Sequence, residues 1–146
     1  MAKPFRCRLV TPVSSLLDEE VSYASIPAWD GSMGVLPSRA PILARLGVGE
    51  LRLEFPDSTK GQGGKRSYLL EGGFVQMLNN NLTILAERAT PAESITLADA
   101  ESELKAAEAK SVPADASNRA LKQTQLQHER EVARAKVHMA KNRGAI

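Results

Sequence analysis

The residues of this chain that could do chemistry stand at spacings that catalysis does not use. The single cysteine, Cys7, alternates with Arg6 and Arg8 in a strand-like pattern and has no histidine near it in sequence. We therefore predict a buried apolar side chain there and no nucleophile. His128 and His138 are too far apart for a helical i, i+4 ligand pair, and no acidic or cysteine cluster accompanies them. No metal site is predicted.

Two glycine-containing stretches match phosphate-binding loops only in part. The pair Gly64-Lys65 has Thr59 where such a loop requires its first glycine. Arg66 occupies the following serine or threonine position, so a hairpin tip is the simpler interpretation. Segment 47–49 lacks the third glycine of a dinucleotide-binding motif and leads into a strand, so no helix N-terminus is available to a phosphate. The sequence thus predicts no catalytic residue, no cofactor and a protein that is not an enzyme.

One charge pattern does indicate a partner. Segment 115–143 carries seven basic residues and three acidic ones, a net charge of +4 (7 − 3). The segment before it is biased toward acidic residues. A solvated surface is one interpretation of the basic segment, and an acidic protein partner is the other. The basic residues are Arg119, Lys122, Arg130, Arg134, Lys136, Lys141 and Arg143.

Length and composition bound the remaining possibilities. With 146 residues, 42% hydrophobic and 25% charged, the chain fits one ordinary domain or two small ones with a packed core. A net charge of +2 is too small for nucleic-acid binding by the whole chain. A single cysteine excludes an internal disulfide and favours a reducing compartment. Charged residues interrupt every apolar stretch well before the roughly 18 residues of a membrane span.

Composition also divides the chain near residue 91. All six aromatic residues precede residue 75, whereas 92–143 contains no glycine and one proline, Pro113. We predict a β domain over 1–91 and a helical domain over 92–146. Alternating apolar and polar residues favour about ten short strands in a β-sandwich or flattened barrel. Expected strands include 5–9, 21–26, 33–36, 51–55, 68–71, 74–78 and 82–86, with hairpin turns at 61–64 and 79–81.

The helical domain is predicted to be an antiparallel hairpin. Thr96 is a candidate N-cap for a first helix, and Ser111-Val112-Pro113 ends that helix. A second helix is expected over 115–141. The predicted apolar faces are Leu97, Ala100, Leu104 and Ala107 on the first helix, and Leu121, His128, Val132, Ala135 and Met139 on the second. Because alanine buries few methylene groups, each worth about 0.8 kcal/mol, we expect weak docking and a movable hairpin.

Segment 31–43, GSMGVLPSRAPIL, carries a more specific signal. It resembles the signature G-x-x-G, two hydrophobic residues, P-x-x-A-P and two hydrophobic residues of the F-type ATP synthase epsilon subunit. Segments 68–75 (YLLEGGFV) and 82–87 (LTILAE) also match that family in order and spacing. The resemblance covers nearly the whole chain, because the family has an N-terminal β-sandwich and a C-terminal helical hairpin.

The resemblance implies a central-stalk rotor subunit that performs no chemistry itself. Its sandwich would contact the gamma subunit and the ring of c subunits, and so couple proton flow to ATP synthesis in the catalytic head. Its hairpin would extend toward the beta and alpha subunits and inhibit ATP hydrolysis. The subunit would lie on the cytoplasmic face of the bacterial plasma membrane, or at a plastid thylakoid, without entering the bilayer.

Matching positions one by one assigns two contact surfaces. The implied c-ring and gamma contacts are Thr11, Asp30, Ser32, Met33, Arg39, Leu43 and Ala44. The implied contacts with an acidic segment of the beta subunit are Arg119, Lys122, Arg130 and Arg134. Two positions depart from the family pattern, since several members have an acidic residue in place of Ser32 and a histidine in place of Arg39.

Segment 98–103 departs from the motif Ile/Leu-Asp-x-x-Arg-Ala with which some bacterial members bind ATP. Ser102 and Glu103 occupy the arginine and alanine positions, so a triphosphate would meet negative charge there. We predict no tight ATP binding.

Two other classes of function stay open. One is a β-sandwich scaffold or adaptor whose basic hairpin binds an acidic protein or a nucleic acid, although the basic helix lacks the aromatic residues that stack on bases. The other is a small enzyme that uses Cys7, which rapid alkylation of the thiol at neutral pH would support.

Overall fold

Strands form the first part of the chain and helices the second. The computed structural model describes residues 4–36, 40–56, 64–115 and 117–144. The chain divides into two compact units, Met1–Pro91 and Ala92–Ile146. Within the described residues the strands are β1 Phe5–Val10, β2 Ser15–Val21, β3 Tyr23–Ala28, β4 Gly31–Val35, β5 Ile42–Glu54, β6 Lys65–Leu78, β7 Asn81–Ala86 and β8 Ala89–Pro91. The helices are the short 3-10 helix η1 Ala92–Ser94, α1 Leu97–Ala109 and α2 Arg119–Gly144.

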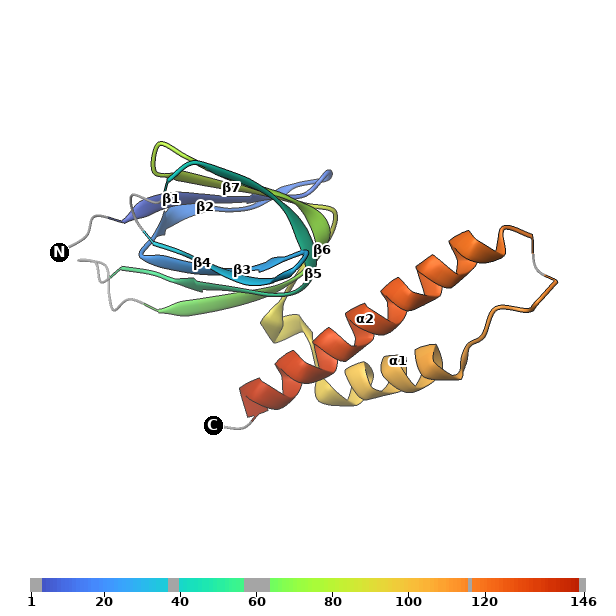
Figure 1. The fold of residues 1–146 in the computed structure, drawn as a ribbon. Helices are drawn as coiled ribbons and strands as arrows, with labels where there is room; N and C mark the ends of the chain where they lie inside the picture. Colours follow the sequence, from blue (N-terminus) through green and yellow to red (C-terminus); the bar gives the residue numbers. More distant parts are fainter. Residues whose placement is uncertain (1–3, 37–39, 57–63, 116, 145–146) are drawn as a thin grey trace. The chain divides into compact units, whose positions relative to one another are not determined.

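The strands form one sheet that curls on itself into a sandwich. The strand order is β2-β1-β7-β6-β5-β3-β4, and β8 pairs with β6. Figure 1 shows β1, β2 and β7 in one layer and β3 and β4 in the other, with β5 and β6 curving between them. Every pairing is antiparallel except that of β1 with β7. The predicted all-β sandwich followed by a helical hairpin is thus confirmed, with eight described strands in place of about ten short ones.

The long strands β5 and β6 join the layers and explain the lower strand number. Segments 68–71 and 74–78, predicted as separate strands, are parts of the single strand β6. Gly72 and Gly73 stand between them with positive φ angles of 90° and 121°, so the strand bends there without ending. A Cβ on Gly73 would lie 1.9 Å from the carbonyl oxygen of Leu85, so no other residue fits.

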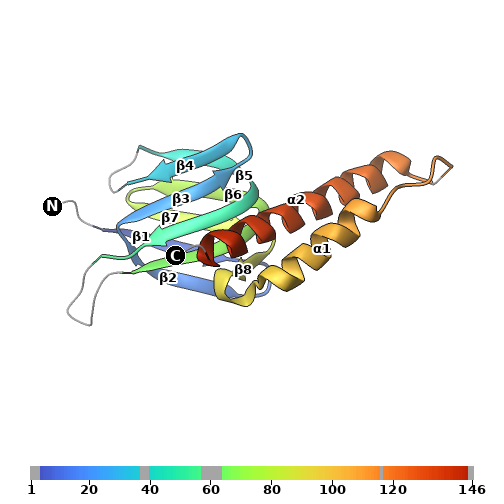
Figure 2. The ribbon, with the colours of Figure 1, turned by 90° about the horizontal axis from the view of Figure 1, so that it is seen from below.

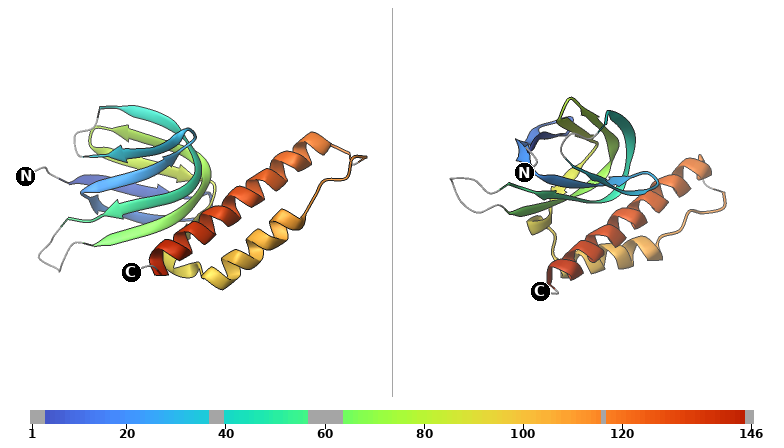
Figure 3. Two further views of the ribbon diagram at one scale, coloured as in Figure 1. Left: turned by 60° about the horizontal axis from the view of Figure 1, so that its bottom comes forward. Right: turned by 60° about the vertical axis from the view of Figure 1, so that its left-hand side comes forward.

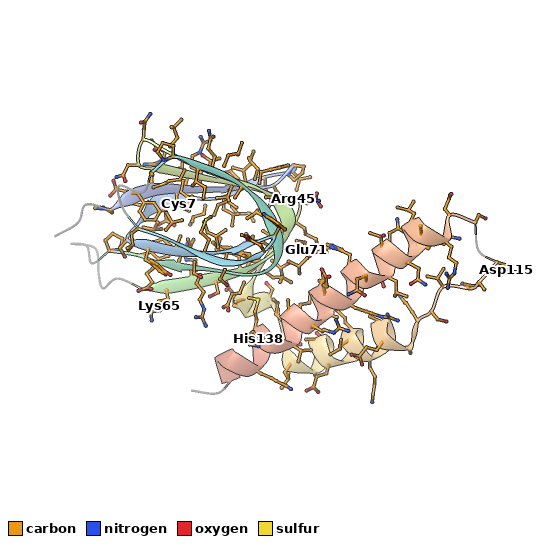
Figure 4. The ribbon with its side chains drawn as sticks, viewed as in Figure 1. Cys7, Arg45, Lys65, Glu71, Asp115 and His138 are labelled. Atoms are coloured by element: carbon orange, nitrogen blue, oxygen red, sulfur yellow. The ribbon has the colours of Figure 1, made fainter. Side chains whose placement is uncertain are left out.

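The core lies between the two layers and consists of large aliphatic side chains. Phe5, Leu9, Ile26, Leu53 and Ile84 are among its fully buried members. The inner residues of each strand alternate with outer ones, as the period-two pattern predicts. Cys7 is fully buried in this core, and burial raises the pKa of its thiol to about 12. The prediction of a buried Cys7 is confirmed, and Figure 4 shows its place in β1.

Turn chemistry fixes one hairpin, and two strands were not predicted from the sequence. Asn79 and Asn80 adopt the left-handed conformation between β6 and β7, which confirms the predicted turn. Residues 61–63 of the other predicted turn lie outside the described residues. Strand β2 was not predicted, because an acidic run separates its only buried residues, Leu17 and Val21. The three-residue strand β8 also lies outside the predicted set.

The helical unit has the predicted cap and hairpin, but a different buried face. The hydroxyl oxygen of Thr96 accepts a hydrogen bond from the backbone N–H of Asp99 at 3.3 Å, which confirms the N-cap. Figures 2 and 3 show α1 and α2 side by side and antiparallel. The predicted stripe on α2 is wrong in its first half, because Leu121 is 57% exposed and His128 is also exposed. The buried residues of α2 are Leu126, Val132, Ala133, Val137, Met139 and Ala140.

Candidate partner-binding surfaces

The turn between β3 and β4 presents part of the predicted ring contact. The backbone N–H of Trp29 donates to the carbonyl of Arg45 at 3.0 Å, which ties the turn to β5. Asp30 and Ser32 are exposed, whereas Met33 is half-buried and packs against the core. These residues therefore form an exposed polar tip on a rigid hairpin. The predicted contact Arg39 lies outside the described residues.

The remaining predicted contacts of the sandwich come from two other places. Leu43 projects outward from β5 and is 73% exposed, while its neighbour Ala44 is half-buried against the core. Thr11 lies in the turn after β1, where its N–H donates to the carbonyl of Ser14 at 2.8 Å and its hydroxyl to the same oxygen at 3.3 Å. Strands β6 and β7 separate β5 from β1, so Thr11 and Leu43 are not neighbours.

A row of apolar side chains bridges these separated positions on the outer face of the sheet. Phe74 of β6 pairs directly with Leu85 of β7, and both are more than half exposed, at 55% and 52%. The row continues to half-buried Val10 on one side, and Leu43 lies diagonally from Phe74 on the other. We call the set Val10, Leu43, Phe74, Leu78 and Leu85 the outer apolar patch.

Trp29 extends this surface toward the β3–β4 turn. Its neighbour Ala28 pairs with Leu46, which places Trp29 beside Arg45 in the row that continues to Phe74. Its side chain is 70% exposed, although tryptophan is normally buried. The surface therefore joins the predicted contacts of the β3–β4 turn to those predicted at Leu43 and near Thr11.

Sequence reasoning missed Trp29, Phe74 and Leu85, although a signal was present. Strand β6 has apolar residues at both parities, since Val75 and Met77 are buried while Phe74 and Leu78 are exposed. Strand β7 repeats this with buried Ile84 beside exposed Leu85. A strand with one solvated face normally carries polar residues there, so apolar residues at the outward parity indicate a covered face.

The four basic residues predicted to bind an acidic partner do not share one environment. The side chains of Arg119, Lys122 and Arg134 are exposed, and none of them forms an ion pair with a described residue. Arg130 instead donates from Nε to the carbonyl of Ala107 at 3.1 Å and from Nη2 to the carbonyl of Lys110 at 2.7 Å. Arg130 therefore bonds to the C-terminal end of α1.

Two further charges of the basic segment are balanced within the hairpin. The ammonium group of Lys136 lies 2.9 Å from a carboxylate oxygen of Glu103, so one basic side chain of α2 is paired with α1. Glu129 of α2 accepts from Lys110 at 3.0 Å. These two pairs engage one basic and one acidic side chain of segment 115–143, so they leave its net charge of +4 unchanged.

The described residues do not show the geometry of a metal site. No group of three or more histidine, cysteine, aspartate or glutamate side chains among them is placed to hold a metal ion. An open depression of about 470 Å³ lies beside Phe55, but Arg66 stacks over that ring at 4.7 Å and pairs with Glu19 at 3.1 Å. None of the described helices is long and apolar enough to cross a membrane.

Comparison with known proteins finds similarity to subunits of ATP synthase. Residues 4–92 match the family model described as "ATP synthase, Delta/Epsilon chain, beta-sandwich domain". The chain is 38% identical over 88 residues to the ATP synthase epsilon chain of Rhodopirellula baltica, covering 60% of this chain and 64% of that one. It therefore spans just under two thirds of that relative's length. The epsilon chain of Pelotomaculum thermopropionicum is 36% identical over 107 residues, 73% of this chain and 75% of that one.

Solved structures resemble the chain in fold. A chain in a cryo-EM structure of the Euglena gracilis mitochondrial ATP synthase (OSCP, F1 and c-ring) superposes with a TM-score of 0.74 at 23% identity. That match covers 90% of this chain and 78% of the other. A chain in the central stalk and c-ring structure of the Tetrahymena thermophila mitochondrial ATP synthase gives a TM-score of 0.64 at 15% identity, covering 95% and 98%.

Proposed function

The chain belongs to the epsilon subunits of F-type ATP synthase, and from this premise we propose that it is a rotor subunit with two separate tasks. Its sandwich binds the gamma subunit and the ring of c subunits, and so couples proton flow to ATP synthesis. Its hairpin extends toward the beta and alpha subunits and restrains ATP hydrolysis. The subunit itself is not catalytic and holds no cofactor.

The outer apolar patch is the observation that carries the docking proposal. Phe74, Leu85 and Leu43 expose more than half of their side chains on one face of the sheet. Burying apolar surface is worth about 25 cal/mol per Å², so a partner that covers these side chains gains binding energy. We assign this patch to gamma, because an apolar, rigid sheet face suits a permanent subunit contact.

The polar turn between β3 and β4 suits the ring. Asp30 and Ser32 offer exposed polar groups at the tip, and Trp29 offers a large flat apolar surface beside them. Aromatic anchors surrounded by polar groups are typical of the residues that dominate interface energies. The turn is held to β5 by the backbone bond from Trp29 to Arg45, so it can transmit force to the rest of the sheet.

Torque transmission is consistent with the architecture of the sandwich. Strands β5 and β6 are 13 and 14 residues long and are paired along nearly their whole length. They connect the two layers through continuous backbone hydrogen bonds instead of a flexible loop. A load applied at the β3–β4 turn therefore reaches the outer apolar patch through the ladder.

The hairpin supplies the features that a brake needs. Arg119, Lys122 and Arg134 are exposed along α2, where they can meet an acidic segment of the beta subunit. At 1.5 Å per residue, the 26 residues of α2 alone span about 39 Å when detached from α1. ATP is not a ligand of the closed hairpin in this proposal, because Ser102 stands where the ATP-binding motif has its phosphate-binding arginine.

The proposed location follows from the proposed complex. A subunit that binds gamma and the ring lies at the membrane as part of the synthase, on the cytoplasmic face in a bacterium. It does so through protein partners, without inserting into the bilayer.

The test is ATP hydrolysis by a catalytic head that lacks this subunit, titrated with the full chain or with a chain ending at Pro91. The core cluster is built entirely from residues before 92, so the shorter chain retains it. We expect both chains to bind gamma and only the full chain to inhibit. Inhibition by neither would remove the brake, and failure of both to bind gamma would favour the scaffold or adaptor with an acidic protein or nucleic-acid partner.

Surface variants test the patch itself. Phe74→Gln with Leu85→Gln should weaken gamma binding by about 100-fold or more, because two central apolar contacts are lost. The control is Leu121→Gln, which removes an apolar side chain of similar exposure from α2 and should leave gamma binding unchanged. Equal affinities of the double variant and the wild type for gamma would contradict the assignment of the patch.

A further inference from the structure

Arg130 occupies an unusual position for a residue expected to bind an acidic partner. Its Nε donates to the carbonyl of Ala107 at 3.1 Å and its Nη2 to the carbonyl of Lys110 at 2.7 Å. Ala107 is in the last turn of α1 and Lys110 is its C-cap. One guanidinium group of α2 thus bonds two carbonyls at the end of the other helix.

The last four carbonyls of a helix lack the usual i+4 partner. The carbonyl of Ala107 accepts a long bond of 3.4 Å from the backbone N–H of Lys110, so it has room for the second donor that Arg130 supplies. The end of α1 also carries the negative pole of the helix dipole, which favours a cation. No basic residue of α1 itself lies in its last turn. Arg130 therefore satisfies both the hydrogen-bonding requirement and the charge requirement from across the hairpin.

Two ion pairs support the same closed arrangement from either side. Lys136 reaches Glu103 at 2.9 Å, and Lys110 reaches Glu129 at 3.0 Å. Lys110, Glu129 and Glu103 are exposed and Lys136 is half-buried, and ion pairs with exposed partners contribute little by themselves. The half-buried Arg130 is the one of the three whose bonds are directed at fixed backbone atoms.

We propose that Arg130 is the latch of the hairpin, bonded to α1 in the closed state and released when the helices separate. This inference rests on the proposed brake and adds how it is regulated. Because Nε and Nη2 of Arg130 are bonded to the α1 carbonyls, a carboxylate partner that takes this pair of donors in a two-pronged contact must first open the hairpin. Arg130 thus sets the population of the open state, while Arg119, Lys122 and Arg134 set the affinity for the partner.

A distance measurement on the isolated full chain tests the latch without the synthase. Spin labels are attached at Ala106→Cys and Gln127→Cys, two exposed positions on α1 and α2. The native Cys7 is fully buried and stays unlabelled in the folded protein. With Arg130 present we expect one narrow distance distribution. Arg130→Ala should raise the fraction of the longer distance about tenfold, because two charge-assisted hydrogen bonds are lost.

The matched control is Arg134→Ala, which removes the same charge from an exposed position on the same helix. It should leave the distance distribution unchanged. Arg130→Lys keeps the charge but replaces the two-pronged donor by a single ammonium, and should give an intermediate open fraction. Circular dichroism separates opening from unfolding, since an opened hairpin keeps its helix content.

Hydrolysis assays then separate the latch from the brake. Arg134→Ala should weaken inhibition, whereas Arg130→Ala should preserve or strengthen inhibition at limiting protein, because more molecules are open. If the wild-type chain does not inhibit hydrolysis, the proposed brake fails while the distance measurement still decides the latch. Identical distance distributions for Arg130→Ala and the wild type would overturn the latch.

Discussion

The sandwich and the helical hairpin are stabilised by different kinds of contact. The core of the sandwich is made of Phe5, Leu9, Ile26 and other large side chains that are fully buried. On α1 the buried residues are two alanines, Ala100 and Ala107. Since stabilisation scales with the apolar area removed from water, the sandwich is held by its core and the hairpin depends more on polar contacts. The comparison indicates that the hairpin can open while the sandwich keeps its core.

The polar contacts of the two units also differ. In the sandwich, backbone ladders between strands satisfy the main chain, and all of these are lost only by unfolding. In the hairpin, the contacts between helices include single side-chain bonds such as Arg130 to Lys110 and Lys136 to Glu103. Each of these bonds can be replaced individually by a bond to a partner protein. A rigid joint and a movable arm therefore occur in one chain of 146 residues.

The largest effect is expected at Gly73 of the sandwich. Gly73→Ala places a Cβ at 1.9 Å from the carbonyl oxygen of Leu85, on a backbone with a φ of 121°. We expect a loss of about 4 kcal/mol or more in the free energy of unfolding, from backbone strain and steric overlap together. Chemical denaturation measures it. The control is Gly64→Ala, where a Cβ meets nothing within 4 Å, and a similar loss there would contradict the explanation.

The next effect concerns the core that distinguishes the two units. Leu53→Ala removes a fully buried side chain and should cost about 3 kcal/mol in the free energy of unfolding of the sandwich. Leu78→Ala, at a site 43% exposed, should cost well under half as much. Urea denaturation followed by the fluorescence of Trp29 reports on the sandwich alone, and equal losses at the two sites would break the comparison.

A smaller effect is expected in the hairpin and should stay there. Thr96→Ala removes the acceptor that caps the N–H of Asp99 and should cost the first helix about 1 kcal/mol. Hydrogen exchange should speed up in α1 and remain unchanged in the strands. Thr124→Ala is the control, because its hydroxyl bonds within α2 to the carbonyl of Ala120 and alanine favours a helix interior. Faster exchange in β5 and β6 after Thr96→Ala would show that the two units are coupled.

The smallest effect concerns charge on the sandwich surface. The hydrogen bond from Arg6 at 2.6 Å lowers the pKa of Asp18 below its usual value. A carboxylate with a lowered folded-state pKa stabilises the fold above its unfolded pKa, and that contribution is lost as the pH falls through the folded value. Arg6→Gln should raise the pKa of Asp18 in an NMR titration and change stability only slightly, because both side chains are exposed. An unchanged pKa would contradict the pairing.

Periodicity and turn chemistry predicted most of the fold. The alternation in β1 and β7, the turn at Asn79 and Asn80 and the Thr96 cap are local signals, and each is confirmed. Strand β2 was missed because acidic Glu19 interrupts the inward-facing residues Leu17 and Val21, and its acidic residues pair with partners distant in sequence, Arg6 and Arg66. The sequence of one strand does not show which distant residues form ion pairs with its charges.

The wrong half of the α2 stripe has a geometric cause. Helix α1 has 13 residues and α2 has 26, so α1 can accompany only part of the longer helix. The bonds from Arg130 to the end of α1 mark where that accompaniment begins. Leu121 lies well before this point and is exposed, whereas Leu126 is buried and His128 is exposed, so the buried face of α2 runs through Leu126 and not through His128. The lengths of the two helices and their offset decide which residues of α2 are buried, and the hydrophobic periodicity of the sequence shows neither of these quantities.

The predicted partner surface was incomplete for a related reason. Thr11, Asp30 and Leu43 came from a position-by-position match to a family, which marks single positions but not the surface between them. Trp29, Phe74 and Leu85 become part of one surface only once β3, β5, β6 and β7 are placed side by side. The role of Arg130 likewise required the register of the two helices, because its bonding partners are 20 and 23 residues away in sequence.

The parallel pairing of β1 with β7 has a consequence for how the protein is made. The 70 residues between Val10 and Asn81 must be synthesised before β1 can take its place beside β7. At roughly 5–20 residues per second, β1 and β2 wait several seconds on the ribosome as a two-stranded hairpin, which is marginally stable in water. The sandwich therefore closes late, in a step dominated by contacts distant in sequence, which are slow to form. The helices that follow are translated only after every strand needed for that closure has been made.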